Sequence, residues 1–125
     1  MNKKQDSNLT TEQKFILHEE GTEQPGTSPL NNEKRKGSYH CVNCGVKLFD
    51  SKTKYESGSG WPSFFKSLPD VFETKTERLL GYPRTEYHCK NCKGHHGHIF
   101  DDGPIPTGKR YCNNGLCLVF KLNKK

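Results

Sequence analysis

Two pairs of cysteines constrain the fold of this chain more than any other feature of its sequence. Each pair has the CxxC spacing, and residues 45–88 separate the first pair from the second. The four residues are Cys41, Cys44, Cys89 and Cys92. Thiolates suit zinc, and the two-residue spacer lets both sulfurs of a pair reach one tetrahedral centre. Four sulfurs fill that shell, so the sequence predicts one structural Zn²⁺ that joins two distant hairpins and activates no water.

A glycine follows each pair, Gly45 in the first and Gly94 in the second. A backbone that bends around sulfur often needs a positive φ, which glycine adopts readily, so we expect a left-handed residue at both. Disulfides are the alternative use of the four thiols. Nothing in the sequence indicates export, and a reducing cytosol disfavours structural disulfides, so zinc is preferred.

The size and composition favour a single small domain that depends on its metal. Only 30% of the 125 residues are hydrophobic, so a large self-sufficient core is not expected. A structural zinc contributes on the order of 10 kcal/mol, comparable with the whole stability of such a domain. We predict one domain over 9–122, between a polar tail at 1–8 and a basic tail at 123–125.

The first residues include lysines but no apolar stretch of the kind that a secretory leader needs, and no later run reaches transmembrane length. We therefore expect a cytoplasmic monomer with no membrane partner. The net charge of +6 raises nucleic acid as a partner. Many lysines lie in the tails and acidic residues interrupt the middle of the chain, so solvated surface charge is preferred and no nucleic acid is expected.

The pattern of short elements predicts a mainly β fold. Thr10 and Gln13 fit a capping box that opens a short helix ending near Gly21, and residues 21–37 are expected to be loop. Turn residues separate most of the short candidate strands that follow. These are Tyr39–Cys41, Lys47–Phe49, Thr85–Cys89, His98–Phe100, Lys109–Cys112 and Leu116–Lys121. Such a pattern is typical of an antiparallel β sandwich or distorted barrel, here stapled by the four-cysteine zinc site.

Three aromatic residues follow flexible glycines in the stretch SGSGWPSFF. Pro62 stiffens the backbone after Trp61, the single tryptophan of the chain. For Phe64 and Phe65 a core position is the preferred interpretation. For Trp61, a place on a glycine-flanked loop favours a functional surface.

Three histidines crowd the stretch HHGH: His95, His96 and His98. Imidazole titrates near neutral pH, so the cluster can handle protons or bind metal. Strand alternation would place His96 and His98 on one face and His95 on the other, although Gly97 makes regular alternation uncertain. Because the four cysteines already complete a metal shell, proton handling is preferred over ligation.

The residues around Cys112 in the sequence are typical of those around a reactive thiol. Arg110 lies two residues before it, on the same face of a strand, and a fixed positive charge lowers the pKa of a nearby thiol. Asn114 continues the same row and can bind a polar substrate atom. Taken alone, the row also fits an inert buried cysteine beside a surface arginine.

Together these motifs resemble the type B methionine sulfoxide reductases, which reduce the R epimer of methionine sulfoxide. The matching blocks are GTEQP, CVNCGVKLF, KYESGSGWPSF, the R-x-E-x-x-C-x-x-C run at 84–92, GHHGHIFDDGP and PTGKRYCNN. The resemblance implies zinc on the four paired cysteines, catalysis by Cys112, and Trp61 against the substrate methyl group. It also implies that His95, His98, Arg110 and Asn114 surround the sulfoxide, and that the substrates are oxidised proteins or peptides.

The chain departs from the family pattern at four positions. Ser59 stands where many members carry a resolving cysteine, His96 where leucine is usual, Asn113 where an aliphatic residue is usual, and Gly26 where an aromatic residue is common. Another cysteine, Cys117, lies five residues after Cys112, but a continuous strand would hold the two about 16 Å apart. We expect Cys117 to be a core residue, and an external reductant, thioredoxin-like or a small thiol, to restore Cys112.

Two other function classes fit part of the sequence. A zinc-ribbon module that binds nucleic acid would explain the charge and the cysteine pairs, but it leaves Cys112 without a task. A metal enzyme with histidine ligands would require a second metal ion, and the HHGH stretch would supply its ligands.

Overall fold

The computed structural model describes residues 9–19, 21–78 and 81–122, and the predicted tails at 1–8 and 123–125 lie outside this part of the chain. The first element is helix α1, Thr11–Glu19. Its start is the predicted capping box, because the Thr10 backbone N–H donates to Gln13 Oε1 and the Gln13 N–H donates to Thr10 Oγ1. The helix buries Ile16 and Leu17 and ends before Gly21, as expected.

Two antiparallel sheets follow, which confirms the predicted mainly β fold. The smaller sheet has the order β2-β1-β9 and is formed by β1 (Gly37–Cys41), β2 (Lys47–Asp50) and β9 (Leu118–Leu122). The larger sheet has the order β3-β4-β8-β7-β6-β5. Its strands are β3 (Lys54–Tyr55), β4 (Ser63–Phe64), β5 (Phe72–Glu77), β6 (Arg84–Cys89), β7 (His95–Phe100) and β8 (Arg110–Asn113). Short 3-10 helices lie at Pro29–Asn32, Ser51–Thr53 and Gly115–Cys117.

An aromatic core joins the two sheets as a sandwich. Phe49 of β2 stacks on Phe64 of β4 with ring centroids 3.9 Å apart, and Tyr39 of β1 meets the edge of the same ring at 5.0 Å. Tyr87 of β6 and Tyr111 of β8 complete this layer from the larger sheet. One face of the larger sheet is therefore filled by core residues, and the opposite face is left for other contacts.

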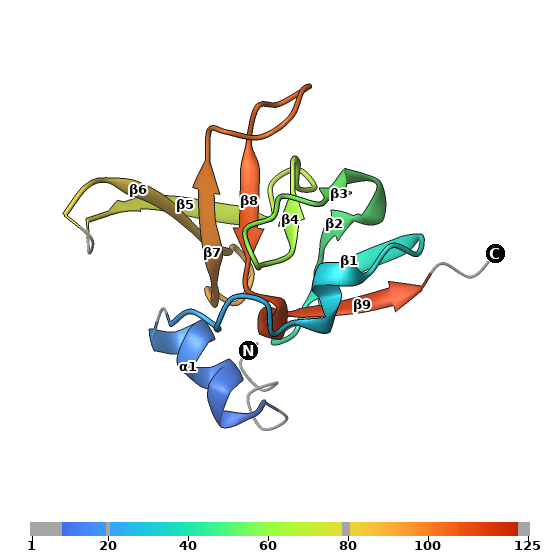
Figure 1. Cartoon of the computed structure of the whole chain (residues 1–125). Coiled ribbons are helices and arrows are strands. Elements are labelled where there is room, and N and C mark those ends of the chain that lie inside the picture. Colours follow the sequence, from blue (N-terminus) through green and yellow to red (C-terminus); the bar gives the residue numbers. More distant parts are fainter. Residues whose placement is uncertain (1–8, 20, 79–80, 123–125) are drawn as a thin grey trace.

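The segment between α1 and β1 passes beneath the lower ends of β7 and β8 (Figure 1). It is mostly irregular, as predicted, and a hydrogen bond from Gly26 N to Gly60 O (2.7 Å) joins it to the loop that precedes β4. Gly60 has a φ of 97° there, and a Cβ at that position would lie 2.7 Å from the Cβ of Pro25. The segment thus brings residues near the start of the domain against the loop that carries Trp61.

Strand β5 was not predicted from the sequence. Its segment, FETKTE, forms the outer strand of the larger sheet and pairs with β6 as a projecting hairpin (Figure 1). The predicted strand Leu116–Lys121 is also partly wrong, because Gly115–Cys117 is a 3-10 helix and β9 begins at Leu118. Within the described residues no helix is both long and apolar enough to cross a bilayer.

Candidate active site and metal centre

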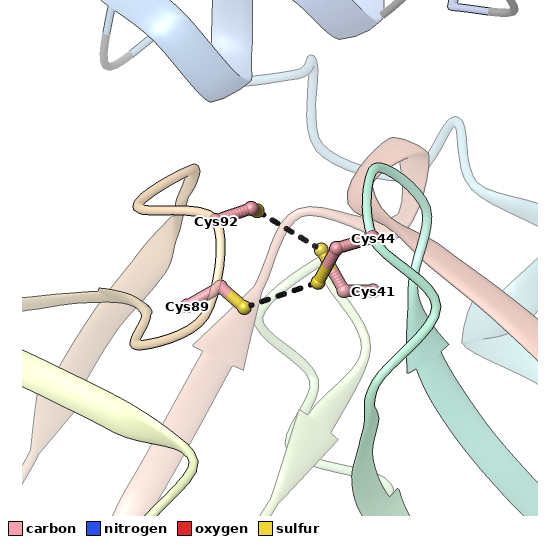
Figure 2. Close-up of side chains that lie close together, drawn as sticks. All are labelled: Cys41, Cys44, Cys89 and Cys92. Atoms are coloured by element: carbon pink, nitrogen blue, oxygen red, sulfur yellow. Dashed lines mark hydrogen bonds between the residues drawn. The ribbon is translucent and has the colours of Figure 1, made fainter. Parts of the chain in front are cut away.

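The four paired cysteines come together from two loops. One pair lies at the end of β1 and the other at the end of β6, and the sulfurs face each other across the gap between these loops (Figure 2). Cys41 Sγ lies 3.7 Å from Cys92 Sγ, and Cys44 Sγ lies 3.6 Å from Cys89 Sγ. All four sulfurs lie within 4.8 Å of one another.

These distances fit a tetrahedral metal site and not disulfides. With Zn–S bonds of about 2.3 Å, sulfurs at the corners of a tetrahedron are about 3.8 Å apart. All four thiols are free. The four thiols move one another's pKa in opposite directions: hydrogen bonds with the other three raise the pKa of Cys41, and one from Cys41 lowers the pKa of Cys44 to about 6. The set can therefore hold one metal ion in an all-sulfur shell.

The turn after each cysteine pair is similar, but one of the two expected glycines is not the left-handed residue. Gly45 N donates to Cys41 O and Lys93 N donates to Cys89 O, and these two residues have φ values of 84° and 70°. The expectation for Gly94 is wrong, since it is not among the residues with positive φ. A Cβ on Gly94 would lie 2.6 Å from Leu17 Cδ2, so any larger residue there would displace the Leu17 side chain of helix α1.

A pocket of about 90 Å³ opens on the face of the larger sheet that does not meet the smaller one. Its lining comes from β6, β7 and β8, from the loop before β4 and from the segment after α1. The lining residues are Thr22, Trp61, Arg84, Gly97, His98, Phe100, Cys112 and Asn114. The structure therefore brings four of the predicted site residues into one cavity: Trp61, His98, Cys112 and Asn114.

Cys112 lies at the centre of this arrangement. It pairs with His98 on one side and with Ser63 on the other. Burial raises the pKa of the Cys112 thiol, while a hydrogen bond with Ser59 and the charge of Arg110 act in the opposite direction. Arg110 lowers this pKa, as expected, but desolvation outweighs it and the pKa is raised.

Arg110 is held beside the pocket by two partners. Its Nε and Nη2 donate to the Asp102 carboxylate at 2.8 and 3.1 Å, and its guanidinium lies 4.3 Å from the centre of the Phe100 ring. The carboxylate offsets much of the positive charge. Arg110 is not among the residues that line the pocket, but its guanidinium lies over the ring of Phe100, which is one of them.

A β-bulge sets the directions of the three histidines. Tyr87 pairs with Gly97 while the next residue of β6, His88, pairs with His95, so β7 carries one extra residue at His96. The alternation predicted from the sequence is therefore broken. His95 and His98 lie together with ring centroids 5.6 Å apart, and His96 points into the core. The prediction that His96 and His98 share a face is wrong.

Carboxylates contact both His95 and His98. His98 Nε2 lies 3.0 Å from Glu77 Oε2, which also bonds Arg84 Nε at 2.5 Å. His95 Nδ1 lies 3.3 Å from Glu86 Oε1, and this pair is buried. Burial lowers the pKa of His98, Arg84 lowers it further, and Glu77 raises it. His95 is not among the pocket-lining residues, so His98 is the imidazole nearer the cavity.

Glu23 links the parts of the pocket, and sequence reasoning missed it. Its carboxylate accepts hydrogen bonds from the backbone N–H groups of Gly115 and Leu116 at 2.8 and 3.0 Å. Its carbonyl oxygen accepts from Trp61 Nε1 at 3.0 Å, and its N–H donates to Asn114 Oδ1 at 3.0 Å. The sequence offers only its place in the GTEQP block as a signal. Glu77, Arg84 and Glu86 were likewise not assigned, since their partners lie on other strands.

Cys117 lies apart from the pocket. It is fully buried against Ile16 and Leu17 of α1, in a cluster separate from the main core. The prediction of a core cysteine is confirmed, although the reason given for it, a continuous strand from Cys112, does not hold. Phe64 is a core residue as predicted, whereas Phe65 is only partly buried.

Among the residues that the structure describes, the four cysteines are the only group of three or more His, Cys, Asp or Glu side chains placed to hold a metal ion. The three histidines of β7 do not form such a group.

Comparison with known proteins gives one consistent family. The family model described as the SelR domain matches residues 9–122. A Pseudomonas putida protein named peptide methionine sulfoxide reductase MsrB is 50% identical over 115 residues, which cover 90% of this chain and 86% of that protein. A Methanosarcina barkeri protein of the same name is 46% identical and covers 94% of this chain and 83% of the relative. The chloroplastic peptide methionine sulfoxide reductase B1 of Oryza sativa is 46% identical, over 90% of this chain and 53% of its own length.

Proposed function

Because this chain belongs to the SelR-domain family of methionine sulfoxide reductases, we propose that it reduces the R epimer of peptide-bound methionine sulfoxide with Cys112 as nucleophile. It is an oxidoreductase, and the alternative of a nucleic-acid-binding module without catalysis is not supported. One observation carries the assignment of roles. Cys112, His98 and Trp61 line the same pocket, although they come from three different segments.

The Cys112 thiolate attacks the electrophilic sulfur of the sulfoxide, and the oxygen of the substrate takes a proton as it leaves that sulfur. In the net step, the oxygen passes to Cys112, which becomes a sulfenic acid, and methionine is released. The substrate sulfur gains two electrons and the Cys112 sulfur loses them. Burial disfavours the free thiolate, so the reaction depends on groups that stabilise charge beside it, such as the Ser59 hydroxyl and Arg110.

An imidazolium is the proposed proton donor. His98 is the stronger candidate because it lines the pocket and is the direct cross-strand partner of Cys112. Glu77 supports its charged form. His95 lies behind it, against Glu86, and is proposed to pass a proton to His98 or to hold its ring. Such general acid catalysis typically accounts for a rate factor of about 10² to 10⁴.

Trp61 is proposed to pack against the methyl group of the sulfoxide. Its indole N–H is held by the carbonyl of Glu23, which fixes the ring plane at the edge of the pocket. A cavity of about 90 Å³ accommodates the end of one side chain. Shape on the methyl side and a proton donor on the oxygen side together distinguish the two epimers. Arg110 and Asn114 are proposed to contribute to the polar surroundings of the oxygen.

We propose that the four clustered cysteines bind one structural Zn²⁺, which would supply a cross-link between the loops that follow β1 and β6. No open coordination position remains in a four-sulfur shell, so the catalytic step is proposed to take place in the pocket that Cys112 lines.

An external thiol is proposed to return Cys112 to its reduced form. Ser59, and not a cysteine, hydrogen-bonds Cys112, and Cys117 is buried in another cluster. A thioredoxin-like protein or a small thiol would attack the sulfenic acid and release water, and a second thiol would complete the disulfide of the reductant. The cytoplasm supplies such thiols, and we propose that the protein acts there as a monomer.

The test is turnover of a peptide with separated R and S methionine sulfoxide epimers. The wild type should reduce only the R epimer. Cys112→Ser should lose turnover, and Cys117→Ser, the matched control at the other non-paired thiol, should retain it. Reduction of the S epimer, or turnover by Cys112→Ser, would overturn the proposal. Mass spectrometry after one turnover without reductant should find a sulfenic acid on Cys112, and a disulfide between Cys112 and Cys117 would contradict the proposed external reductant.

A further inference from the structure

A buried chain of hydrogen bonds leads from the core to one of the four clustered sulfurs. Tyr87 O–H donates to Asn113 Oδ1 at 2.8 Å, and Asn113 Nδ2 lies 3.3 Å from His96 Nδ1. His96 Nε2 lies 3.4 Å from Cys41 Sγ. Each of these four residues is at most 1% exposed. Because water does not reach them, their polar atoms must find partners within the protein.

All the hydrogen bonds in this series donate in the same direction, from Tyr87 towards Cys41. Asn113 Oδ1 accepts from the tyrosine, so its amide nitrogen faces His96 and donates. A neutral imidazole that accepts at Nδ1 carries its proton on Nε2, and that N–H points at the Cys41 sulfur. A thiolate is the natural acceptor at the end of such a chain. The same amide nitrogen of Asn113 also donates to Asn114 O at 2.9 Å, which holds its orientation.

The two central residues, His96 and Asn113, come from the neighbouring strands β7 and β8, and the fold brings their side chains into contact. With leucine and an aliphatic residue in their places the chain of donors would not exist. A buried polar pair is unfavourable unless its hydrogen bonds are completed, so the two residues depend on each other. None of the steps proposed for the reductase reaction uses either of them.

We propose that His96 supports the metal centre from outside its ligand set by donating its Nε2–H to the Cys41 sulfur, with Asn113 holding the ring in the tautomer that can donate. A hydrogen bond to a metal-bound thiolate withdraws charge from the sulfur, which opposes its protonation and its departure from the metal. Partners of this kind typically change metal affinity by about 10- to 100-fold. The inference depends on a metal at the cysteine cluster and not on the identity of the nucleophile, so it can fail independently of the proposed reaction.

The arrangement also links the metal centre to the active site. Asn113 follows Cys112 in β8, and its backbone N–H donates to the carbonyl of Pro62, the residue after Trp61, at 3.0 Å. Hydrogen bonds through His96 and Asn113 therefore connect the Cys41 sulfur with the strand of the nucleophile.

The experiment measures the rate at which the zinc-loaded protein releases its metal to an excess of a chromogenic chelator. His96→Leu should release zinc about 10- to 100-fold faster than the wild type. His96→Gln keeps an amide N–H for the sulfur and a carbonyl oxygen for Asn113, so its release should stay near the wild-type rate. His88→Leu is the matched control, since this imidazole of the neighbouring strand bonds Glu73 and no sulfur. Equal release rates for wild type and His96→Leu, or for His96→Leu and His96→Gln, would overturn the proposal.

A double-mutant cycle and the protonation of the ring give independent tests. Asn113→Leu should also accelerate release, and adding it to His96→Leu should accelerate release no further, because the donor is already gone. Additive effects would contradict the proposal. If the leucine variants do not fold, a long-range proton–nitrogen spectrum of the zinc-loaded wild type still decides. The His96 ring should be protonated at Nε2, and a proton at Nδ1 would exclude it as the donor.

Discussion

Cys112 and His98 face each other across strands β8 and β7, near the middle of the six-stranded sheet. Directly opposed side chains in an antiparallel pair have Cβ atoms about 4.5 to 5.5 Å apart. The same row continues to Ser63 on β4 and Glu86 on β6. The proposed nucleophile and the proposed acid are thus positioned by strand register, while the tryptophan that completes the pocket comes from a loop.

The thiol of Cys112 should lose its proton only at high pH. Burial raises its pKa above the ordinary value of 9.0, so little thiolate is present at neutral pH and alkylation by iodoacetamide should still accelerate above pH 9. Ser59→Ala removes a hydrogen bond that lowers this pKa, so the midpoint should move to higher pH. Mass spectrometry of the Cys112 peptide against pH gives both midpoints. Ser67→Ala, at a serine after β4 that bonds the carbonyl of Leu68, is the control. A wild-type midpoint below that of a free cysteine would contradict the prediction.

The acid limb of the activity profile should respond to Glu77. This carboxylate raises the pKa of His98, whereas burial and Arg84 lower it. Glu77→Gln should therefore lower the pKa of His98, and the imidazolium fraction and the rate at neutral pH should both fall, with activity recovering as the pH is lowered. The measurement is kcat against pH. Glu73→Gln, which removes the carboxylate from the His88 pair outside the pocket, should leave the profile unchanged.

Loss of Glu23 should disrupt the pocket and the fold together. Glu23→Ala leaves the buried N–H of Gly115 without its acceptor, and an unsatisfied buried group costs about 1 to 3 kcal/mol. Urea unfolding should show this loss. KM should also rise, because without the carboxylate bonds the Glu23 backbone, which bonds Trp61 and Asn114, is no longer fixed to Gly115 and Leu116. Glu23→Gln keeps one acceptor oxygen, so its stability should lie between those of the wild type and Glu23→Ala. Glu12→Ala on the exposed face of α1 is the control, and equal stability of all four proteins would refute the role of this carboxylate.

A methyl group at Gly97 should separate two strands of the site. Its Cβ would lie 1.9 Å from the carbonyl oxygen of Cys112, a backbone atom that cannot rotate away. Gly97→Ala should lower the free energy of unfolding by about 1 to 3 kcal/mol and reduce kcat, since β8 must move from β7. Thr76→Ala, an exposed position on β5 of the same sheet, should change neither quantity. Retention of full stability and activity by Gly97→Ala would show that the strands can adjust.

Removal of metal should unfold the protein. Binding to a four-sulfur site contributes on the order of 10 kcal/mol, which is comparable with the stability of a whole domain. With the metal bound, a thiol reagent should modify Cys112 and leave Cys117 and the paired cysteines unreacted. After chelation all six should react, and the far-ultraviolet circular dichroism of the sheets should be lost. A chelated protein that keeps its spectrum would show that the core alone is sufficient.

The elements that sequence reasoning found are those with local signals. The capping box at Thr10 and Gln13 identifies helix α1, and the two CxxC pairs identify the cysteine cluster that could hold a metal ion, because the spacing within each pair brings its two sulfurs together. Strand β5 carries no such signal. Its polar sequence follows from its outer place in the sheet, which is a property of the assembled fold.

The errors in the site arise where contacts between distant residues decide the local geometry. The extra residue at His96 is defined only by the pairing of β7 with β6, so alternation along β7 could not give the directions of its histidines. The pKa of Cys112 was assigned from Arg110 alone, whereas the burial that dominates it comes from the surrounding segments. Glu23 was missed for the same reason, since the groups that it bonds are 38 to 93 residues away.

The span of the Glu23 contacts has a consequence for the order in which the molecule assembles. The carboxylate and the Gly115 N–H that it holds are 92 residues apart in the sequence. Closing so long a loop early is entropically unfavourable, and hairpins such as β5–β6 can form before it. During synthesis on the ribosome the pocket therefore forms late, after nearly the whole domain has left the exit tunnel, and a shorter nascent chain has no competent catalyst.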